Sequence, residues 1–160
     1  MSNELKQLFE QRIADELYNH QVYKFFANRL KNIGLDNLAK FFNKQASDEL
    51  HHYNILIDYC NQRNIDVEFL AIKSVEIEYV TLIDIARMFL KLEQNNTRDI
   101  KAMINVAMQE GDLLSYKWLI DDLLKEQIEE EDLAQTLSDK LINIGDDMPM
   151  IQIFDQGMEL

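Results

Sequence analysis

Four carboxylates fall where the sequence predicts buried apolar side chains. Each interrupts a series of apolar residues spaced three and four apart, which is the spacing of one buried helical face. The four are Glu16, Glu49, Glu93 and Glu130, and His52 follows Glu49 on the same face. A buried carboxylate is costly unless it takes up a proton, pairs with a cation or binds a metal. Four inward carboxylates and one Glu-x-x-His pair therefore indicate a metal site inside a helical bundle.

The apolar series predict four long helices, which span residues 4–33, 36–64, 81–108 and 111–143. Gly34 and Gly111 mark two tight connections between helices. Asp36 and Asp112 are candidate N-caps for the helices that follow. Each carboxylate lies near the middle of its own helix, so antiparallel neighbours would bring all four to one height. The buried face of the fourth helix is predicted to include Leu113, Tyr116, Ile120, Leu123, Gln127 and Glu130.

The connection between the second and third predicted helices is unusually long. Residues 65–80 are rich in Val, Ile, Phe and Tyr and alternate in part with period two, which predicts extended chain. A helix of ~27 residues is about 40 Å long, and an extended segment of ~16 residues reaches roughly 50 Å. The segment can therefore cross over along the whole bundle. Residues 148–156 predict a short fifth helix, with an Asp pair before it, Pro149 in its first turn and Gly157 after it.

Length and composition predict one domain over residues 1–160, with 47% hydrophobic residues, one Pro and four Gly. No apolar run reaches the roughly 18 residues of a membrane span. A polar N-terminal segment without a secretory signal and a single cysteine, Cys60, predict a cytoplasmic protein. The formal net charge of −13 argues against nucleic acid and anionic membranes as partners, because both require clustered Lys and Arg.

The inward carboxylates have two explanations, a metal centre or buried ion pairs. No Lys or Arg lies on any of the four apolar faces, so few cations are available for pairing. A metal is the simplest neutraliser, and several carboxylates with one imidazole around two ions favour iron over manganese or zinc. A solvated helix face is the competing interpretation of Glu49 and His52. Both residues, however, lie on the apolar face, whereas His51 lies off it.

Further polar residues surround the cluster. Asp48, Glu126 and Glu129 lie on the inner shoulders of their helices and are candidates for a third, weaker metal site, with a solvated face as the alternative. Tyr23 could hydrogen-bond a ligating carboxylate or donate an electron, or serve as a core residue. His20 lies one helical turn from Glu16. Its imidazole is expected to hydrogen-bond that carboxylate and orient it, in preference to binding the metal directly.

These motifs resemble those of the non-haem bacterial ferritins over nearly the whole chain. They are Glu16-Leu17-Tyr18 followed by Tyr23, Asp48-Glu49-Leu50-His51-His52, Glu93, and Lys125-Glu126-Gln127-Ile128-Glu129-Glu130-Glu131. The resemblance implies a four-helix bundle that assembles as a homo-oligomeric 24-subunit shell. It also implies a di-iron ferroxidase centre that oxidises Fe(II) with O2 or H2O2, and storage of ferric mineral in the shell's cavity.

The resemblance assigns roles to individual residues. It implies that one iron is held by Glu16, Glu49 and His52. The second iron would share Glu49 and add Glu93 and Glu130, with Gln127 nearby. The third site would map to Asp48, Glu126, Glu129 and Glu130. Two positions depart from the family pattern, because His20 replaces a small or apolar residue and Asp48 is shorter than the usual Glu.

Related families fit less well. Bacterioferritins and rubrerythrins resemble a design with a second Glu-x-x-His on the last helix, where this chain has Gln127-x-x-Glu130. Bacterioferritin haem also needs a Met on the second helix, and residues 36–64 contain none, so no haem is expected.

Two functions remain open, an iron-oxidising storage enzyme and a ferritin-fold metal-binding or structural protein without fast turnover. The complete set of ligand residues favours the enzyme. The apolar stretches 67–80 and 148–154 are hard to bury within one bundle and predict subunit interfaces, at a two-fold and a four-fold contact respectively.

Overall fold

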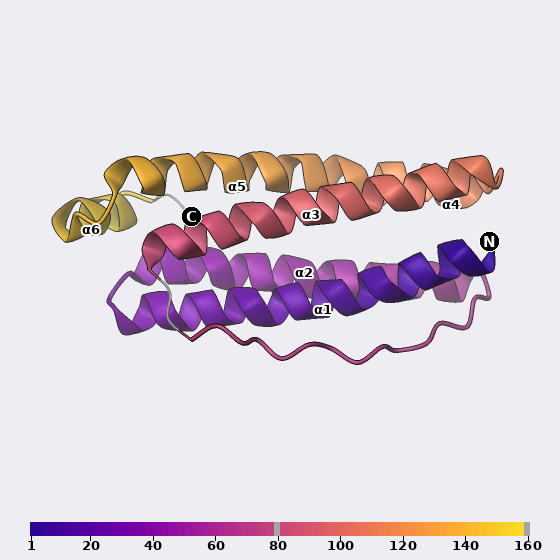
Figure 1. Cartoon of the computed structure of the whole chain (residues 1–160), viewed down its shortest axis with the longest axis horizontal. Helices are drawn as coiled ribbons and strands as arrows, with labels where there is room; N and C mark the ends of the chain where they lie inside the picture. The colour runs from indigo at the N-terminus through magenta and orange to yellow at the C-terminus, as the bar shows by residue number, and fades with distance from the viewer. Residues whose placement is uncertain (79–80, 159–160) are drawn as a thin grey trace.

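The chain folds as an antiparallel four-helix bundle with a long crossover and a short C-terminal helix (Figure 1), which confirms the predicted fold class. The computed structural model describes residues 1–78 and 81–158. Its elements are α1 (Asn3–Asn32), α2 (Asp36–Gln62), α3 (Leu82–Gln109), α4 (Leu113–Trp118), the π-helical segment η1 (Leu119–Leu124), α5 (Lys125–Ile144) and α6 (Met148–Gln156). Within the described residues there is no strand. The predicted helices agree with the observed ones to within two residues at each end.

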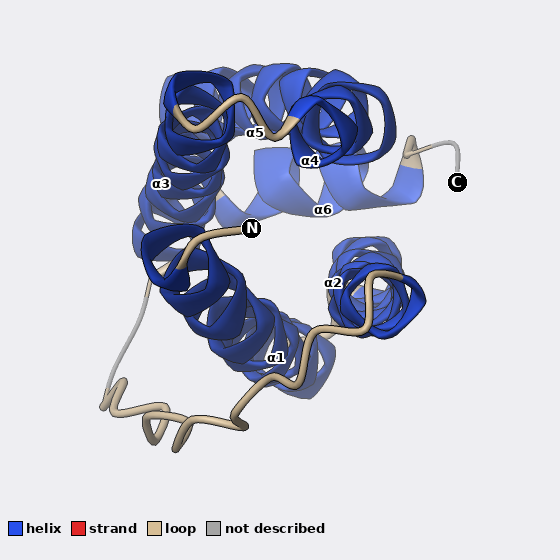
Figure 2. Ribbon diagram, turned by 90° about the vertical axis from the view of Figure 1, so that its right-hand side faces the viewer, coloured by secondary structure: helices blue, strands red, loops and turns tan. Residues whose placement is uncertain are grey.

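The bundle is built from two helix pairs, α1 with α2 and α3 with the continuous α4–η1–α5 helix. Seen end-on in Figure 2, these helices surround a common interior, and α6 lies across one end. Two clusters of buried apolar side chains fill that interior. One contains Phe26, Phe42, Phe89 and Leu137, and the other contains Phe9, Leu56, Ile100 and Leu119. The two clusters leave a short polar band between them.

The π-helical segment changes which face of the fourth helix is buried. The prediction placed Leu113, Tyr116 and Ile120 inside, but Leu113 is 73% exposed and the other two are only partly buried. Ser115 and Leu119 occupy the interior instead, and Leu123 is buried as predicted. A π turn adds one residue to a helical turn, so it rotates the register of everything before it relative to everything after it. Beyond the segment, Gln127 is buried as predicted, and Ala134, Leu137 and Leu141 continue the same buried face.

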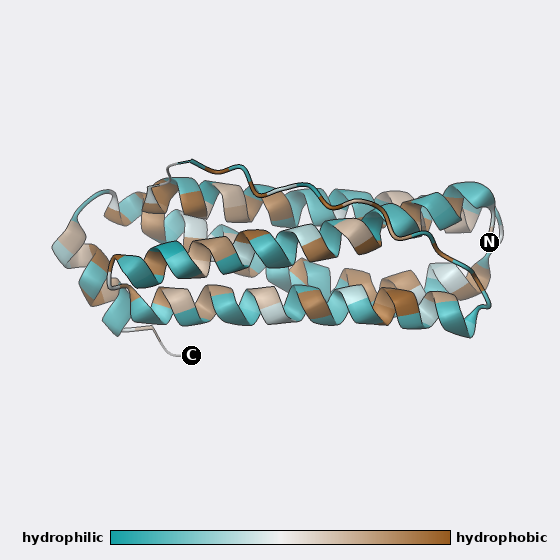
Figure 3. Ribbon diagram, turned by 90° about the horizontal axis from the view of Figure 1, so that it is seen from below, coloured by the Kyte–Doolittle hydropathy of each residue, from teal (hydrophilic) through white to brown (hydrophobic). Residues whose placement is uncertain are grey.

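The crossover runs as extended chain beside α1 from one end of the bundle to the other (Figures 1 and 3), as predicted for the part that the structure describes. Tyr79 and Val80, which the prediction included, lie outside the described residues. Along the crossover, alternate apolar side chains pack against the two core clusters. Its backbone is also tied to α1, because the amide of Glu68 donates to a carboxylate oxygen of Glu10 at 2.8 Å.

The helix ends use both local and distant caps. Asp112 and Asp147 cap α4 and α6 as predicted, by accepting the amides of Ser115 and Met150. The prediction that Asp36 caps α2 was wrong, since Leu35 holds the N-cap position and makes no side-chain bond there. The carboxylate of Asp155 on α6 accepts the amide of Leu38 at 2.7 Å instead. The first turn of α2 is therefore capped by the C-terminal helix, which anchors α6 to the bundle.

In the part of the chain that the structure describes, every helix is too short or too polar to cross a membrane.

Candidate metal centre

The polar band between the two apolar clusters collects side chains from four helices. Its members are Glu16 on α1, Glu49 and His52 on α2, Glu93 on α3, and Gln127 and Glu130 on α5. On each helix, residues of the two apolar clusters lie on both sides of these positions along the chain. All are buried except Glu130, whose side chain is 13% exposed. The structure therefore brings the predicted residues to one depth in the bundle.

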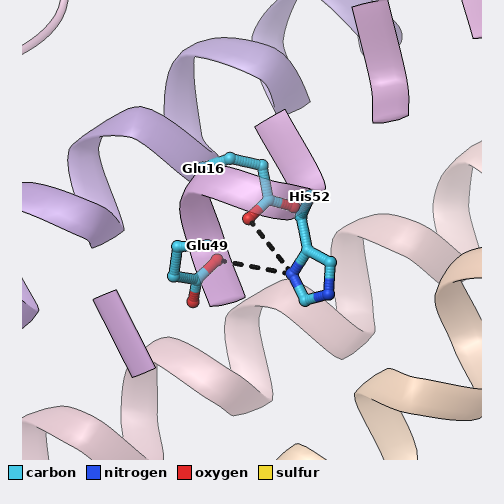
Figure 4. A group of neighbouring side chains, drawn as sticks. All are labelled: Glu16, Glu49 and His52. Atoms are coloured by element: carbon cyan, nitrogen blue, oxygen red, sulfur yellow. Dashed lines mark ion pairs between the residues drawn. The ribbon is translucent and has the colours of Figure 1, made fainter. Parts of the chain in front are cut away.

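Glu16, Glu49 and His52 form the most compact group of the band (Figure 4). Nδ1 of His52 lies 3.8 Å from Oε2 of Glu49 and 4.0 Å from Oε2 of Glu16. Metal–ligand bonds to nitrogen and carboxylate oxygen are about 2.0–2.2 Å long. Atoms separated by these distances can thus bind one ion between them after small side-chain adjustments.

A second group lies on the other side of the imidazole. Nε2 of His52 is 3.4 Å from Oε2 of Glu126 and 4.0 Å from Oε1 of Glu130. Glu126 is half exposed, so this group faces the surface of the bundle, whereas the first group is enclosed. The remaining two candidates for a third metal site do not belong to this group. Asp48 pairs with Lys44 at 2.8 Å, and Glu129 is exposed. Among the described residues, only Glu126 joins His52 and Glu130 in this way.

Glu93 is held by hydrogen bonds instead of by the histidine. The hydroxyl of Tyr23 donates to its Oε1. Its Oε2 accepts from Nε2 of Gln127 at 2.8 Å and from Nδ2 of Asn96 at 3.1 Å. Tyr23 is thus positioned against a carboxylate of the band, and Gln127 orients the same carboxylate from α5. An ion that binds Glu93 must displace or share these donors.

Three carboxylate oxygens of the band are buried without a hydrogen-bond partner among the described residues. They are Oε2 of Glu16, Oε2 of Glu49 and Oε2 of Glu130. An unsatisfied buried oxygen is costly, and on a carboxylate it is a ready ligand for a hard cation. Because the three come from α1, α2 and α5, the residues present fit a metal that binds between the helices.

One buried cation corrects the expectation that the cluster lacks ion-pair partners. Arg12 is 2% exposed, and its Nε lies 2.8 Å from Oε1 of Glu16. Its position one turn before Glu16 was the available signal, because residues four apart share a helical face. The apolar spacing hid it, since Arg12 lies beside Ile13 and not on the predicted face. Asn19 and Asn96 complete this unpredicted polar group through hydrogen bonds.

His20 does not act as predicted. It is partly buried, and its Nδ1–H donates to the backbone carbonyl of Ala46 on α2 at 2.6 Å. The expected hydrogen bond to Glu16 is absent from the described contacts, and Arg12 orients that carboxylate instead. The backbone carbonyl of Ala46 on the neighbouring helix α2 thus takes the place of Glu16 as the partner of the imidazole.

The carboxylates differ in their affinity for protons. Burial raises the pKa of Glu49 well above its usual range, and the neighbouring Glu16 raises it further. Burial, together with Glu93 and Glu16, raises the pKa of Glu130 to about 9. Burial is the strongest single influence on Glu16 and acts to raise its pKa, but interactions with Arg12, Glu49 and His52 together outweigh it and lower the pKa of Glu16. At neutral pH the band therefore holds an ionised Glu16 beside a protonated Glu130, and Glu49 binds a proton more tightly than an ordinary carboxylate does.

The chain is similar to known proteins over nearly its whole length. A family model described as ferritin-like domain matches residues 6–144. The bacterial non-heme ferritins of Staphylococcus aureus (strain USA300) and Staphylococcus haemolyticus (strain JCSC1435) are each 26% identical over 158 residues, which cover 99% of this chain and 95% of each relative. A crystallised open pore ferritin from the hyperthermophilic archaeon Archaeoglobus fulgidus aligns with a TM-score of 0.91 at 26% identity. That alignment covers 98% of this chain and 94% of the archaeal one.

The raised carboxyl pKa values predict that metal binding releases protons. A divalent ion requires the ionised forms of Glu49 and Glu130, whose pKa values are both raised. At pH 7 it must displace the proton of Glu130, so its affinity should rise as the pH approaches about 9. Calorimetric titration with Zn(II) in two buffers of different ionisation enthalpy counts these protons. Glu130→Gln should lower the count by about one, while Glu129→Gln, at an exposed neighbour, should leave it unchanged. Binding without proton release would contradict the prediction.

Proposed function

The chain belongs to the ferritin-like domain family, and from that premise we propose that it oxidises Fe(II) to Fe(III) in the polar band and stores the product as a ferric mineral. The observation that carries the proposal is the buried group of Glu16, Glu49 and His52, in which each carboxylate has one oxygen without a hydrogen-bond partner among the described residues. Iron is the substrate of this reaction and also the stored material. The similarity to proteins named bacterial non-heme ferritins supports the same function.

In the proposed centre, the first iron binds Glu16, Glu49 and His52. The second iron shares Glu49 and adds Glu93 and Glu130. The raised pKa of Glu49 supports its role as the shared ligand, because that rise follows from its burial among other carboxylates. Gln127 acts near the second iron by holding Oε2 of Glu93.

The electrons in the proposed reaction come from the iron. Two Fe(II) ions give one electron each to the oxidant. O2 with two electrons and two protons yields H2O2, and H2O2 with two electrons and two protons yields two water molecules. Tyr23 holds Glu93 through its hydroxyl, and burial next to that carboxylate raises its pKa well above the usual value. The phenol therefore remains a hydrogen-bond donor that orients the carboxylate during the reaction.

Storage requires a closed assembly, and we propose a 24-subunit shell in the cytoplasm. Several apolar side chains of the crossover and of α6 are exposed in the single chain, including Phe69 at 66% and Ile153 at 63%. Exposed apolar side chains gathered on one surface commonly mark interfaces. We place the crossover at a two-fold contact and α6 at a four-fold contact.

The alternative is a ferritin-fold protein that binds metal without fast oxidation. Both proposals predict metal binding, so only turnover separates them. We expect the metal-free protein to consume O2 when Fe(II) is added, and His52→Ala to lose most of this consumption because it removes the imidazole whose two nitrogens face the two ligand groups. His51→Ala is the matched control, since His51 is the exposed neighbour on the same helix. Metal binding by wild-type protein without O2 consumption would favour the alternative.

The second group, in which Nε2 of His52 lies near Glu126 and Glu130, predicts a role for Glu126 in moving iron. Glu126 lies 3.4 Å from His52, whereas Glu129, which is also exposed, belongs to neither ligand group. Glu126→Ala should leave two-iron binding intact and change the rate at which iron leaves the centre, while Glu129→Ala should behave like wild type. Stopped-flow absorbance after repeated Fe(II) additions measures this rate. Equal kinetics in wild type and Glu126→Ala would rule out the third iron site at this position.

The proposed shell predicts the size of the native protein. Native mass spectrometry or analytical ultracentrifugation at micromolar concentration and neutral pH should find an assembly of 24 chains. Replacement of Ile153 by Asp, which places a charge on the exposed apolar side of α6, should reduce the assembly to smaller species. A wild-type protein that is monomeric or dimeric under these conditions would contradict the storage proposal.

A further inference from the structure

A buried arginine beside the proposed metal centre has no assigned role in iron oxidation. We propose that Arg12 acts through Glu16 as a fixed positive charge that weakens metal binding, so that ions pass through the centre instead of remaining in it. This inference rests on the proposed function, because it concerns the same centre. Arg12 is a positioning residue here, since it contacts the carboxylate and not the metal.

The placement of Arg12 is unusual for a cation. Among the residues that the structure describes, it is the one Lys or Arg that is fully buried, with 2% of its surface exposed. Its Nη1 donates to Oδ1 of Asn96 at 2.9 Å, and Asn96 in turn donates to Glu93. The guanidinium is thereby held between Glu16, which is proposed to bind the first iron, and the carboxylate proposed to bind the second.

The contacts of Arg12 indicate that its charge matters more than its hydrogen bonds. Nε lies 2.8 Å from Glu16 in an ion pair, but neither Nε nor Nη2 has a well-aligned hydrogen-bond partner among the described residues. A buried guanidinium with unsatisfied nitrogens is costly, and an apolar residue of similar volume is often at least as stable at such a position. A role in stability therefore does not explain the arginine well, whereas an electrostatic role does.

Glu16 divides its two oxygens between the cation and the centre. Oε1 faces Arg12, and Oε2 is unpartnered and lies 4.0 Å from Nδ1 of His52. A metal can therefore bind through Oε2 while Arg12 keeps Oε1. The bound ion then shares the negative charge of Glu16 with the guanidinium of Arg12. The guanidinium also repels the ion, and this repulsion is strong because the interior has a low dielectric constant.

The charge balance of the loaded centre favours the release of bound iron. The four carboxylates, when ionised, neutralise two Fe(II) ions, so Arg12 leaves the loaded centre with an excess positive charge. Oxidation to Fe(III) increases that excess. A permanent cation at this place thus favours departure of the oxidised ions toward a mineral over their retention as a cofactor.

The test compares Zn(II) affinities of the assembled, metal-free protein by calorimetry at pH 7. Arg12→Gln removes the charge and keeps a polar side chain, so we expect binding to tighten by about tenfold. Arg12→Lys keeps the charge and should remain close to wild type. Arg98→Gln is the matched control, because it removes an arginine from the exposed surface of α3 and should change nothing. A merely structural role would weaken binding in both Arg12 variants.

The outcomes separate this inference from the proposed function. Unchanged or weaker binding in Arg12→Gln would overturn the role of the charge, as would equal behaviour of Arg12→Lys and Arg12→Gln. If the His52→Ala variant binds Zn(II) as tightly as wild type does, the proposed centre itself is overturned. If Arg12→Gln does not fold, a crystal structure of Zn(II)-loaded wild type decides the question. We expect Zn(II) on Oε2 of Glu16 with Arg12 still on Oε1, and displacement of Arg12 from Glu16 would overturn the inference.

Discussion

The burial of four carboxylates in one short band is the constraint on which the rest of this structure depends. Mutual repulsion and loss of hydration both oppose it. The two apolar clusters on either side of the band hold the helices together in spite of that cost. Because the clusters lie at both ends of the bundle and not at its centre, the band can remain polar without dividing the core into separate units.

Each carboxylate offsets its burial in a different way. Glu16 stays ionised beside Arg12, the pKa values of Glu49 and Glu130 are raised, and Glu93 accepts hydrogen bonds from three side chains. These differences assign different parts to chemically similar groups. Metal binding at Glu16 displaces no proton, whereas metal binding at Glu130 exchanges a proton for the metal. The affinity of such a centre for iron therefore depends on pH.

The long connections couple distant parts of the chain to this band. The crossover lies beside α1 and packs against both apolar clusters, so it links the two halves of the bundle. At the opposite end of the chain, Asp155 caps α2, the helix that carries Glu49 and His52. The C-terminal helix, which we place at a subunit contact, is therefore joined directly to a helix of the proposed centre.

The sequence by itself determined the helices, most of their buried faces and the residues of the band. Apolar spacing within one helix is a local property, and it correctly indicated that Glu16, Glu49, His52 and Glu93 are buried. Only the tertiary structure decided the partner of His20, the distant cap of α2, the register of the fourth helix before its π turn, and the ion pair of Arg12. These features depend on which atoms of other helices lie within reach, or on a π turn that apolar spacing does not reveal. Arg12 is the clearest case, because its partner Glu16 is only four residues away, yet its complete burial depends on the packing of α1 against the rest of the bundle.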